Sequence, residues 1–144
     1  MGDGRAVQVL SREECELLIA GADIGRVILT AQALPTALPV SYAVDGGDIV
    51  FCTSAGAKLA AADKGTVVAF EVDHFDPALR IGWSVVVTGL ATVVTDPREI
   101  GRLEGLGIET WVDLSPTHYV RLSASMVSGR RVAPHPVVPA SACS

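Results

Sequence analysis

Runs of β-branched and apolar residues, broken by glycine, constrain the fold of this 144-residue chain most strongly. Residues 66–72 form a nearly continuous β-branched run, which is typical of a strand buried on both faces. Residues 83–95 form a longer run that contains Gly89, a point where a barrel strand is able to bend. The sequence Asp-Gly-Gly-Asp at 45–48 predicts a hairpin turn that needs positive φ angles. We therefore expect a mainly β fold.

Six strands at hairpin spacing are predicted, with helices only at the corners. The expected strands cover residues 25–30, 34–44, 49–53, 66–72, 83–95 and 118–132, and the expected helices lie near residues 11–22, 57–64 and 96–105. This order predicts a small six-stranded antiparallel β-barrel, closed or partly split, with short flanking helices. We expect the domain to cover residues 1–132 and residues 133–144, rich in proline and small residues, to form a flexible C-terminal tail.

Composition narrows the possible partners and the compartment. The net charge is −5 and the basic residues are scattered, so neither a nucleic-acid partner nor an acidic membrane surface is expected. No apolar run reaches the ~18 residues of a membrane span, and residues 1–5 lack the apolar core of a signal peptide. Three cysteines far apart in the sequence favour a reducing cytoplasm, and the histidines have no metal-ligand spacing, so no metal site is expected.

The segment 51–62 carries the strongest functional signal. A predicted strand ends in Thr53 and Ser54, Gly56 follows, and a helix begins with Lys58 in its first turn. Hydroxyl donors, an approachable backbone, the N–H groups of a helix start and a lysine are what a phosphate group needs. Lys58 is one of only two lysines in the chain. The segment therefore predicts a phosphate site, and an ordinary strand-to-helix turn with a surface lysine remains the alternative.

The order of these parts resembles the FMN-binding split-barrel family of pyridoxamine 5′-phosphate oxidase. The resemblance is carried by residues 24–27, 38–42, 49–53 with the following Gly56 and Lys58, and 82–89. It implies that Thr53, Ser54 and Lys58 hold the flavin phosphate. It also implies that the isoalloxazine ring lies against the second and the long strand, at Val40, Ser41, Tyr42, Trp83 and Ser84. Relatives bind the flavin between two subunits, so a homodimer is implied, with Trp111 and the last strand as candidates to complete the partner's site.

One residue departs from the family pattern. Many flavin-binding relatives carry an arginine on the third strand where this chain has Cys52, and a thiol is a much weaker donor than a guanidinium. Cys52 is also interpreted as a small buried hydrophobic residue. Weak flavin binding, or none, is therefore one of the expectations.

Several side chains also have a structural interpretation. Trp83 and Tyr42 could each pack inside the barrel or stack on a ligand ring, and the sequence leaves both roles open. Glu71 lies inside an apolar strand, so we expect it to pair with an arginine such as Arg26 or Arg80.

No nucleophile–base pair or carboxylate dyad is suggested by the spacing, which fits a protein whose cofactor carries the chemistry. The leading hypothesis is a cytoplasmic homodimer that binds FMN and catalyses a flavin-dependent oxidation or reduction of a small molecule. The alternatives are a deazaflavin-dependent reductase and a non-catalytic flavin- or haem-binding dimeric barrel.

Overall fold

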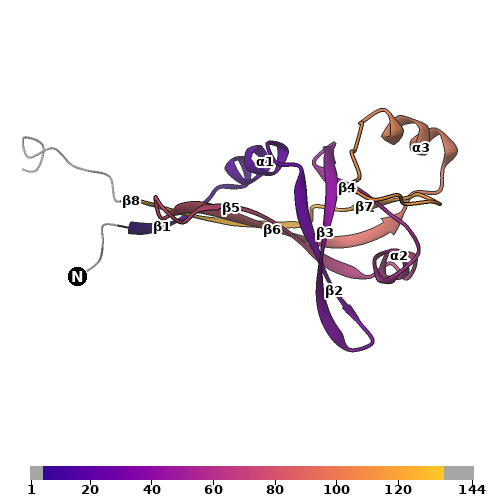
Figure 1. The fold of residues 1–144 in the computed structure, drawn as a ribbon, viewed down its shortest axis with the longest axis horizontal. Coiled ribbons are helices and arrows are strands. Elements are labelled where there is room, and N and C mark those ends of the chain that lie inside the picture. Colours follow the sequence, from indigo (N-terminus) through magenta and orange to yellow (C-terminus); the bar gives the residue numbers. More distant parts are fainter. Residues whose placement is uncertain (1–4, 135–144) are drawn as a thin grey trace, which may run out of the picture.

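The computed structural model describes residues 5–134, which form eight strands and three short helices (Figure 1). The elements in chain order are β1 (Arg5–Val9), α1 (Arg12–Ala20), β2 (Ile24–Ala31), β3 (Leu34–Asp45), β4 (Asp48–Thr53), α2 (Ala57–Asp63), β5 (Val67–Asp76), β6 (Ile81–Val93), α3 (Pro97–Glu104), β7 (His118–Leu122) and β8 (Met126–Pro134). None of these helices is long and apolar enough to cross a membrane. The mainly β class that the sequence predicts is confirmed.

Six strands close into an antiparallel barrel. They follow one another in the order β6, β5, β2, β3, β4 and β7, and β7 pairs with β6 to complete the ring. Strand β8 pairs with the first part of β6, and β1 pairs with β8, so these two strands extend the sheet outside the barrel. The predicted six-stranded split barrel is therefore confirmed, with two additional strands. Of these, β1 was not expected from the sequence.

The final predicted strand, 118–132, is in fact two strands, and Gly89 explains the break. Strand β6 pairs with β8 as far as Thr88 and with β7 from Ala91 onward, so its partner changes at Gly89. The chain between β7 and β8 crosses there, and a Cβ on Gly89 would lie only 1.7 Å from the carbonyl oxygen of Ser123. Only glycine permits this crossing, so the prediction of a single strand was wrong for a tertiary reason.

The expected strands at 66–72 and 83–95 leave residues 73–80 as a loop, and this prediction was wrong for residues 73–76, the first half of the segment. Strand β5 continues to Asp76, and its pairing with β6 runs down to the pair of Asp76 and Ile81. The Asp76 carboxylate accepts the N–H groups of Ala78 and Leu79 at 3.0 and 3.1 Å, which closes a tight turn. Strand β8 includes residues 133 and 134 of the predicted tail, and the rest of that tail lies outside the described residues.

Aromatic side chains fill the barrel. Phe51 stacks on Phe70 with ring centroids 6.5 Å apart, and Tyr42 meets Phe70 edge-on at 5.0 Å. Gly25 leaves room for this cluster, because a Cβ there would lie 2.3 Å from the Phe70 ring. Helices α1 and α2 lie on opposite sides of the β5–β6 ribbon (Figure 1) and add their buried residues to the same core: Cys15, Ile19, Ala61 and Ala62.

The ends of the helices follow their capping residues. Ser11 and Glu14 form the capping box at the start of α1, and Asp96 accepts the N–H of Arg98 at the start of α3. Helix α2 has only seven residues and begins at Gly56 without a side-chain cap. Its position after β4 is therefore set by packing of its buried alanines rather than by local capping.

Candidate functional site

A hollow beside Lys58 brings together several residues that the sequence singles out. It has a volume of about 280 Å³ and lies between β2, β3, the end of β4, the start of α2 and the segment 110–114. We call it the Lys58 hollow. Its lining residues are Ile24, Pro39, Val40, Ser41, Cys52, Lys58, Thr110, Trp111, Val112 and Leu114. Most of this surface is apolar, with a few polar groups, which is the usual composition of a site for an organic cofactor.

Lys58 is the one charged side chain among the residues lining this hollow. It is half-buried and has no ion pair with any side chain of residues 5–134. Burial lowers the pKa of its ammonium group, because removal from water disfavours the charged form. An anionic ligand would stabilise this half-buried ammonium group, because it would supply the counter-ion that the apolar surroundings lack.

Cys52 faces the same hollow and is almost completely buried. Tyr119 lies opposite it on β7. Burial raises the pKa of the Cys52 thiol, so it stays neutral. The predicted burial of Cys52 is confirmed, and its side chain lies at the hollow.

A second, larger hollow adjoins the first. It measures about 660 Å³ and shares Ile24, Ser41 and Trp111 with the Lys58 hollow. We call it the Asp23 hollow, because Asp23 and Glu109 are its charged residues. The other lining residues are Ile19, Ala20, Ala22, Tyr42, Ala43, Val44, Leu106, Gly107 and Ile108. Ser41 and Trp111 thus lie at the boundary between two hollows.

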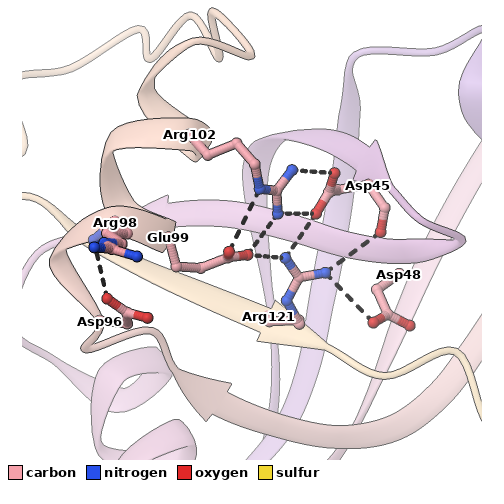
Figure 2. Close-up of polar contacts among 7 residues, drawn as sticks. All are labelled: Asp45, Asp48, Asp96, Arg98, Glu99, Arg102 and Arg121. Atoms are coloured by element: carbon pink, nitrogen blue, oxygen red, sulfur yellow. Dashed lines mark hydrogen bonds and ion pairs between the residues drawn. The ribbon is translucent and has the colours of Figure 1, made fainter.

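The segment that walls both hollows starts from a helix fixed by ion pairs (Figure 2). Asp45 Oδ2 lies 2.7 Å from Nη2 of both Arg102 on α3 and Arg121 on β7. Glu99 Oε1 lies 2.5 Å from Arg102 Nη2 and 2.7 Å from Arg121 Nη2, and Asp48 is 3.4 Å from Arg121. This network joins α3 to the β3–β4 hairpin and to β7. The segment 106–114, which lines both hollows, therefore follows a helix that ion pairs hold against the barrel.

The other predicted site residues lie apart from the Lys58 hollow. Thr53 is buried, its hydroxyl donates to the Ser54 carbonyl at 3.0 Å, and neither residue lines the hollow. Trp83 lines a different hollow near the end of α1, and Ser84 lies beside it on β6, opposite Asp73 of β5. The structure thus brings Val40, Ser41 and Lys58 together, and does not bring Thr53, Ser54, Trp83 or Ser84 to them within one chain.

Tyr42 has its hydroxyl inside the protein. The hydroxyl donates to the Ile19 carbonyl at 2.5 Å, and burial strongly raises its pKa. The ring packs in the aromatic cluster of the barrel. Tyr42 is therefore a residue that packs inside the barrel, which is one of the two roles that the sequence allows.

Sequence reasoning missed most of the wall between α3 and β7. Of its residues only Trp111 was singled out, whereas Thr110, Val112 and Leu114 also line the Lys58 hollow. The available signal was the apolar content of a connection that has no regular secondary structure of its own: Leu106, Ile108, Trp111, Val112 and Leu114. Apolar residues in such a segment indicate packing or a ligand.

A six-stranded antiparallel barrel with two additional strands defines a split-barrel protein. Residues 11–131 match the family described as pyridoxamine 5′-phosphate oxidase. The chain belongs to this family, as the resemblance in its sequence predicts.

Individual relatives agree with this assignment. An uncharacterized protein of Mycobacterium tuberculosis, Rv0080, is 41% identical over 89% of this chain and 87% of its own length. The crystal structure of a putative pyridoxamine 5′-phosphate oxidase from Corynebacterium glutamicum has a TM-score of 0.77 at 28% identity, with 88% of this chain and 98% of that one covered. A FAD binding protein from Mycobacterium smegmatis has a TM-score of 0.69 at 31% identity, with 86% and 98% covered.

Proposed function

We propose that this chain is a flavin-binding protein whose flavin phosphate lies against Lys58. The half-buried ammonium without a counter-ion, in a mainly apolar hollow, is the observation that carries this proposal. A phosphate supplies the missing negative charge. Membership of the pyridoxamine 5′-phosphate oxidase family and the relative named as a FAD binding protein support a flavin over other phosphate-bearing ligands.

FMN is the flavin we propose, with its ring running from the Lys58 hollow along β3. Val40 and Ser41 line that path, and the ring would reach the boundary at Ser41 and Trp111. Trp111 is 85% exposed in a single chain, so its indole is available to a planar ligand. Thr53 and Ser54 adjoin the hollow at the end of β4 and would contribute only after a change in their hydrogen bonding.

A homodimer would complete the site. Trp83 and Ser84 lie in another part of the chain from Lys58, so a ring contact by these residues requires a second copy. The side of β6 that carries Ser84 continues through Val86, Thr88 and Leu90, which are all partly or fully exposed in a single chain. Partly exposed apolar residues such as Val86 and Leu90 fit a contact between subunits.

The activity that we propose is a flavin-dependent oxidation or reduction of a small molecule in the cytoplasm. When bound, the flavin accepts and donates electrons and hydride. The chain's own residues would hold the phosphate at Lys58 and position the ring at Val40 and Ser41. The apolar wall formed by Val112 and Leu114 would keep water from the ring.

A non-catalytic flavin-binding barrel is the second candidate, and Cys52 favours it. The thiol at the hollow leaves a single cation for the phosphate, so the flavin would bind weakly. A deazaflavin-dependent reductase has no comparable observation in its favour.

Titration with flavins tests the proposal. FMN, FAD and a deazaflavin with the same phosphate are added to the purified protein, and the quenching of flavin fluorescence gives each Kd. We expect saturable binding at one site per chain, tightest for FMN, and an absorbance spectrum with flavin bands in the complex. Absence of binding by all three would overturn the proposal, and tighter binding of FAD or of the deazaflavin would reassign the cofactor.

A further inference from the structure

The loop between α3 and β7 has little burial of its own to fix its position. It covers residues 105–117, and we call it the wall loop, because it lines both hollows. Ile108 and Leu114 are half-buried, and the other residues of the loop are exposed. Packing against the barrel therefore contributes little to the placement of this loop.

Hydrogen bonds attach the wall loop to α3 and not to the barrel. The N–H groups of residues 106 and 107 donate to carbonyls of α3. Within the described part of the chain, residues 106–114 make no hydrogen bond to a strand. The position of the wall loop therefore depends on where its two ends are held.

Ion pairs hold the two ends of the wall loop together (Figure 2). Glu99 on α3 precedes the loop, and its Oε1 lies 2.7 Å from Nη2 of Arg121 on β7, which follows the loop. Asp45 Oδ2, at the end of β3, lies 2.7 Å from the same Arg121 nitrogen. Asp45 also accepts two hydrogen bonds from the Arg102 guanidinium of α3, at 2.7 and 2.8 Å. A loop whose ends are joined in this way keeps a compact shape.

The ion pairs supply much of the attachment of α3 itself. Leu103 is the buried residue of this helix, whereas Arg98, Gly101 and Glu104 are exposed. The Arg121 side chain is only 23% exposed, so its ion pairs are partly shielded from water. A network that is partly shielded and contains a bidentate arginine holds more firmly than isolated surface pairs.

We propose that this network is a latch that holds the wall loop closed over both hollows, its members being Asp45, Glu99, Arg102 and Arg121. None of the four lines either hollow, so they are positioning residues for whatever binds there. Release of the latch would move Trp111, Val112 and Leu114 away from the Lys58 hollow. The effect on a flavin rests on the proposed function, whereas the latch itself depends only on the residues of the network.

Digestion of the purified full-length protein with chymotrypsin under native conditions tests the latch without a ligand. Chymotrypsin prefers large apolar and aromatic residues, and Trp111 is 85% exposed. Glu99→Gln removes the ion pairs with both arginines and keeps the size of the side chain. We expect this variant to be cut within the wall loop about fivefold faster than wild type.

The matched control is Glu104→Gln, which removes the same charge from an exposed residue of α3 outside the network. It should be cut at the wild-type rate. Equal cleavage of Glu99→Gln and wild type would overturn the latch. Faster cleavage spread over the whole chain, as mapped by mass spectrometry, would also overturn it, because it would show a loss of overall stability in place of local opening.

Titration with FMN separates the latch from the proposed function. A ligand that binds under the closed loop favours closure, so FMN should slow cleavage of the wild-type loop, and Glu99→Gln should raise the Kd for FMN about fivefold. Faster cleavage of this variant with an unchanged Kd would contradict closure of the loop over the Lys58 hollow. If wild type binds no flavin and Glu99→Gln is still cut faster in the loop, the proposed function fails and the latch stands. If wild type binds FMN and Glu99→Gln matches it in cleavage and in Kd, the latch fails and the proposed function stands.

Discussion

Arg26 on β2 and Glu71 on β5 occupy paired positions in the sheet, with Nη1 of the arginine 3.3 Å from Oε1 of the glutamate. The same Nη1 lies 3.4 Å from Oδ2 of Asp73, so one guanidinium serves two carboxylates. The predicted pairing of Glu71 with an arginine is confirmed. The Arg26 side chain therefore pairs with these carboxylates on the exposed face of the sheet and does not line the Lys58 hollow.

Glu71 should make stability depend on pH. Burial and, to a smaller extent, the adjacent Asp73 carboxylate raise its pKa to about 7, against a weaker lowering by Arg26. Because the folded state holds this proton more tightly than the unfolded chain, stability is expected to fall as the pH rises from about 4.5 to about 7. In wild type the free energy of unfolding should fall by about 1–2 kcal/mol over this pH range, and in Glu71→Gln this fall should be absent. Urea unfolding at a series of pH values measures this effect.

The control for this prediction is Glu13→Gln, which changes an exposed glutamate of α1. It should unfold with the pH dependence of the wild-type protein. An unchanged pH dependence in Glu71→Gln would show that Glu71 is not the group that holds the proton.

Asp45 should stabilise the fold at neutral pH. Its hydrogen bonds with Arg102 and Arg121 hold its pKa well below the usual range. A carboxylate with a depressed pKa stabilises the protein above its unfolded pKa, and this contribution is lost as the pH falls. Asp45→Asn should lower the free energy of unfolding by about 1–3 kcal/mol at neutral pH. The difference from wild type should shrink below about pH 4.

Chemical denaturation near pH 7 and pH 3 measures this effect, with Asp63→Asn on the exposed side of α2 as the control. A loss of stability in Asp45→Asn that is equal at both pH values would rule out the ion network as its origin.

An arginine at position 52 should strengthen flavin binding. Cys52 lines the Lys58 hollow, so a guanidinium there would add charge-assisted hydrogen bonds to the phosphate. Part of this gain is offset by burial of the charge, which leaves about a tenfold decrease in the Kd for FMN. Cys52→Met adds length without charge and should leave the Kd within about twofold. Both variants need a thermal melt to show that they fold, and equal Kd values in folded variants would refute the phosphate assignment at this position.

Alkaline pH should weaken FMN binding through Lys58. Burial lowers the pKa of this ammonium from 10.5, and only its protonated form attracts the phosphate. The Kd for FMN should therefore rise as the pH increases through the lowered pKa. Lys58→Arg should remain charged and lose this dependence. Identical pH profiles for the wild type and Lys58→Arg would show that another group governs the effect.

The sequence predicted features that depend on local patterns. The turn at 45–48, the helix caps at Ser11 and Asp96 and the barrel strands all follow from residue types and their spacing. Burial of Cys52 follows in the same way, because a cysteine within an apolar strand is usually packed.

Features that depend on distant contacts were not predictable. The break between β7 and β8 arises because Ser123 crosses Gly89, 34 positions earlier in the chain. The pairing of Arg121 with Asp45 joins residues separated by 76 positions, and nothing in either neighbourhood indicates it. Residues 106–114 become the wall of two hollows only because α3 is anchored to the barrel. The candidate site was therefore predicted on its β3 and Lys58 side and missed on the opposite side.

The Kd of FMN for Lys58→Ala, compared with that for Lys64→Ala, tests the central claim most directly. Lys64 follows α2 and lines a separate hollow, so its removal changes the net charge equally without touching the proposed phosphate site. We predict that Lys58→Ala raises the Kd at least about tenfold, and that Lys64→Ala changes it by about twofold or less. Equal effects of the two substitutions, or no effect of Lys58→Ala, would contradict a flavin phosphate at Lys58.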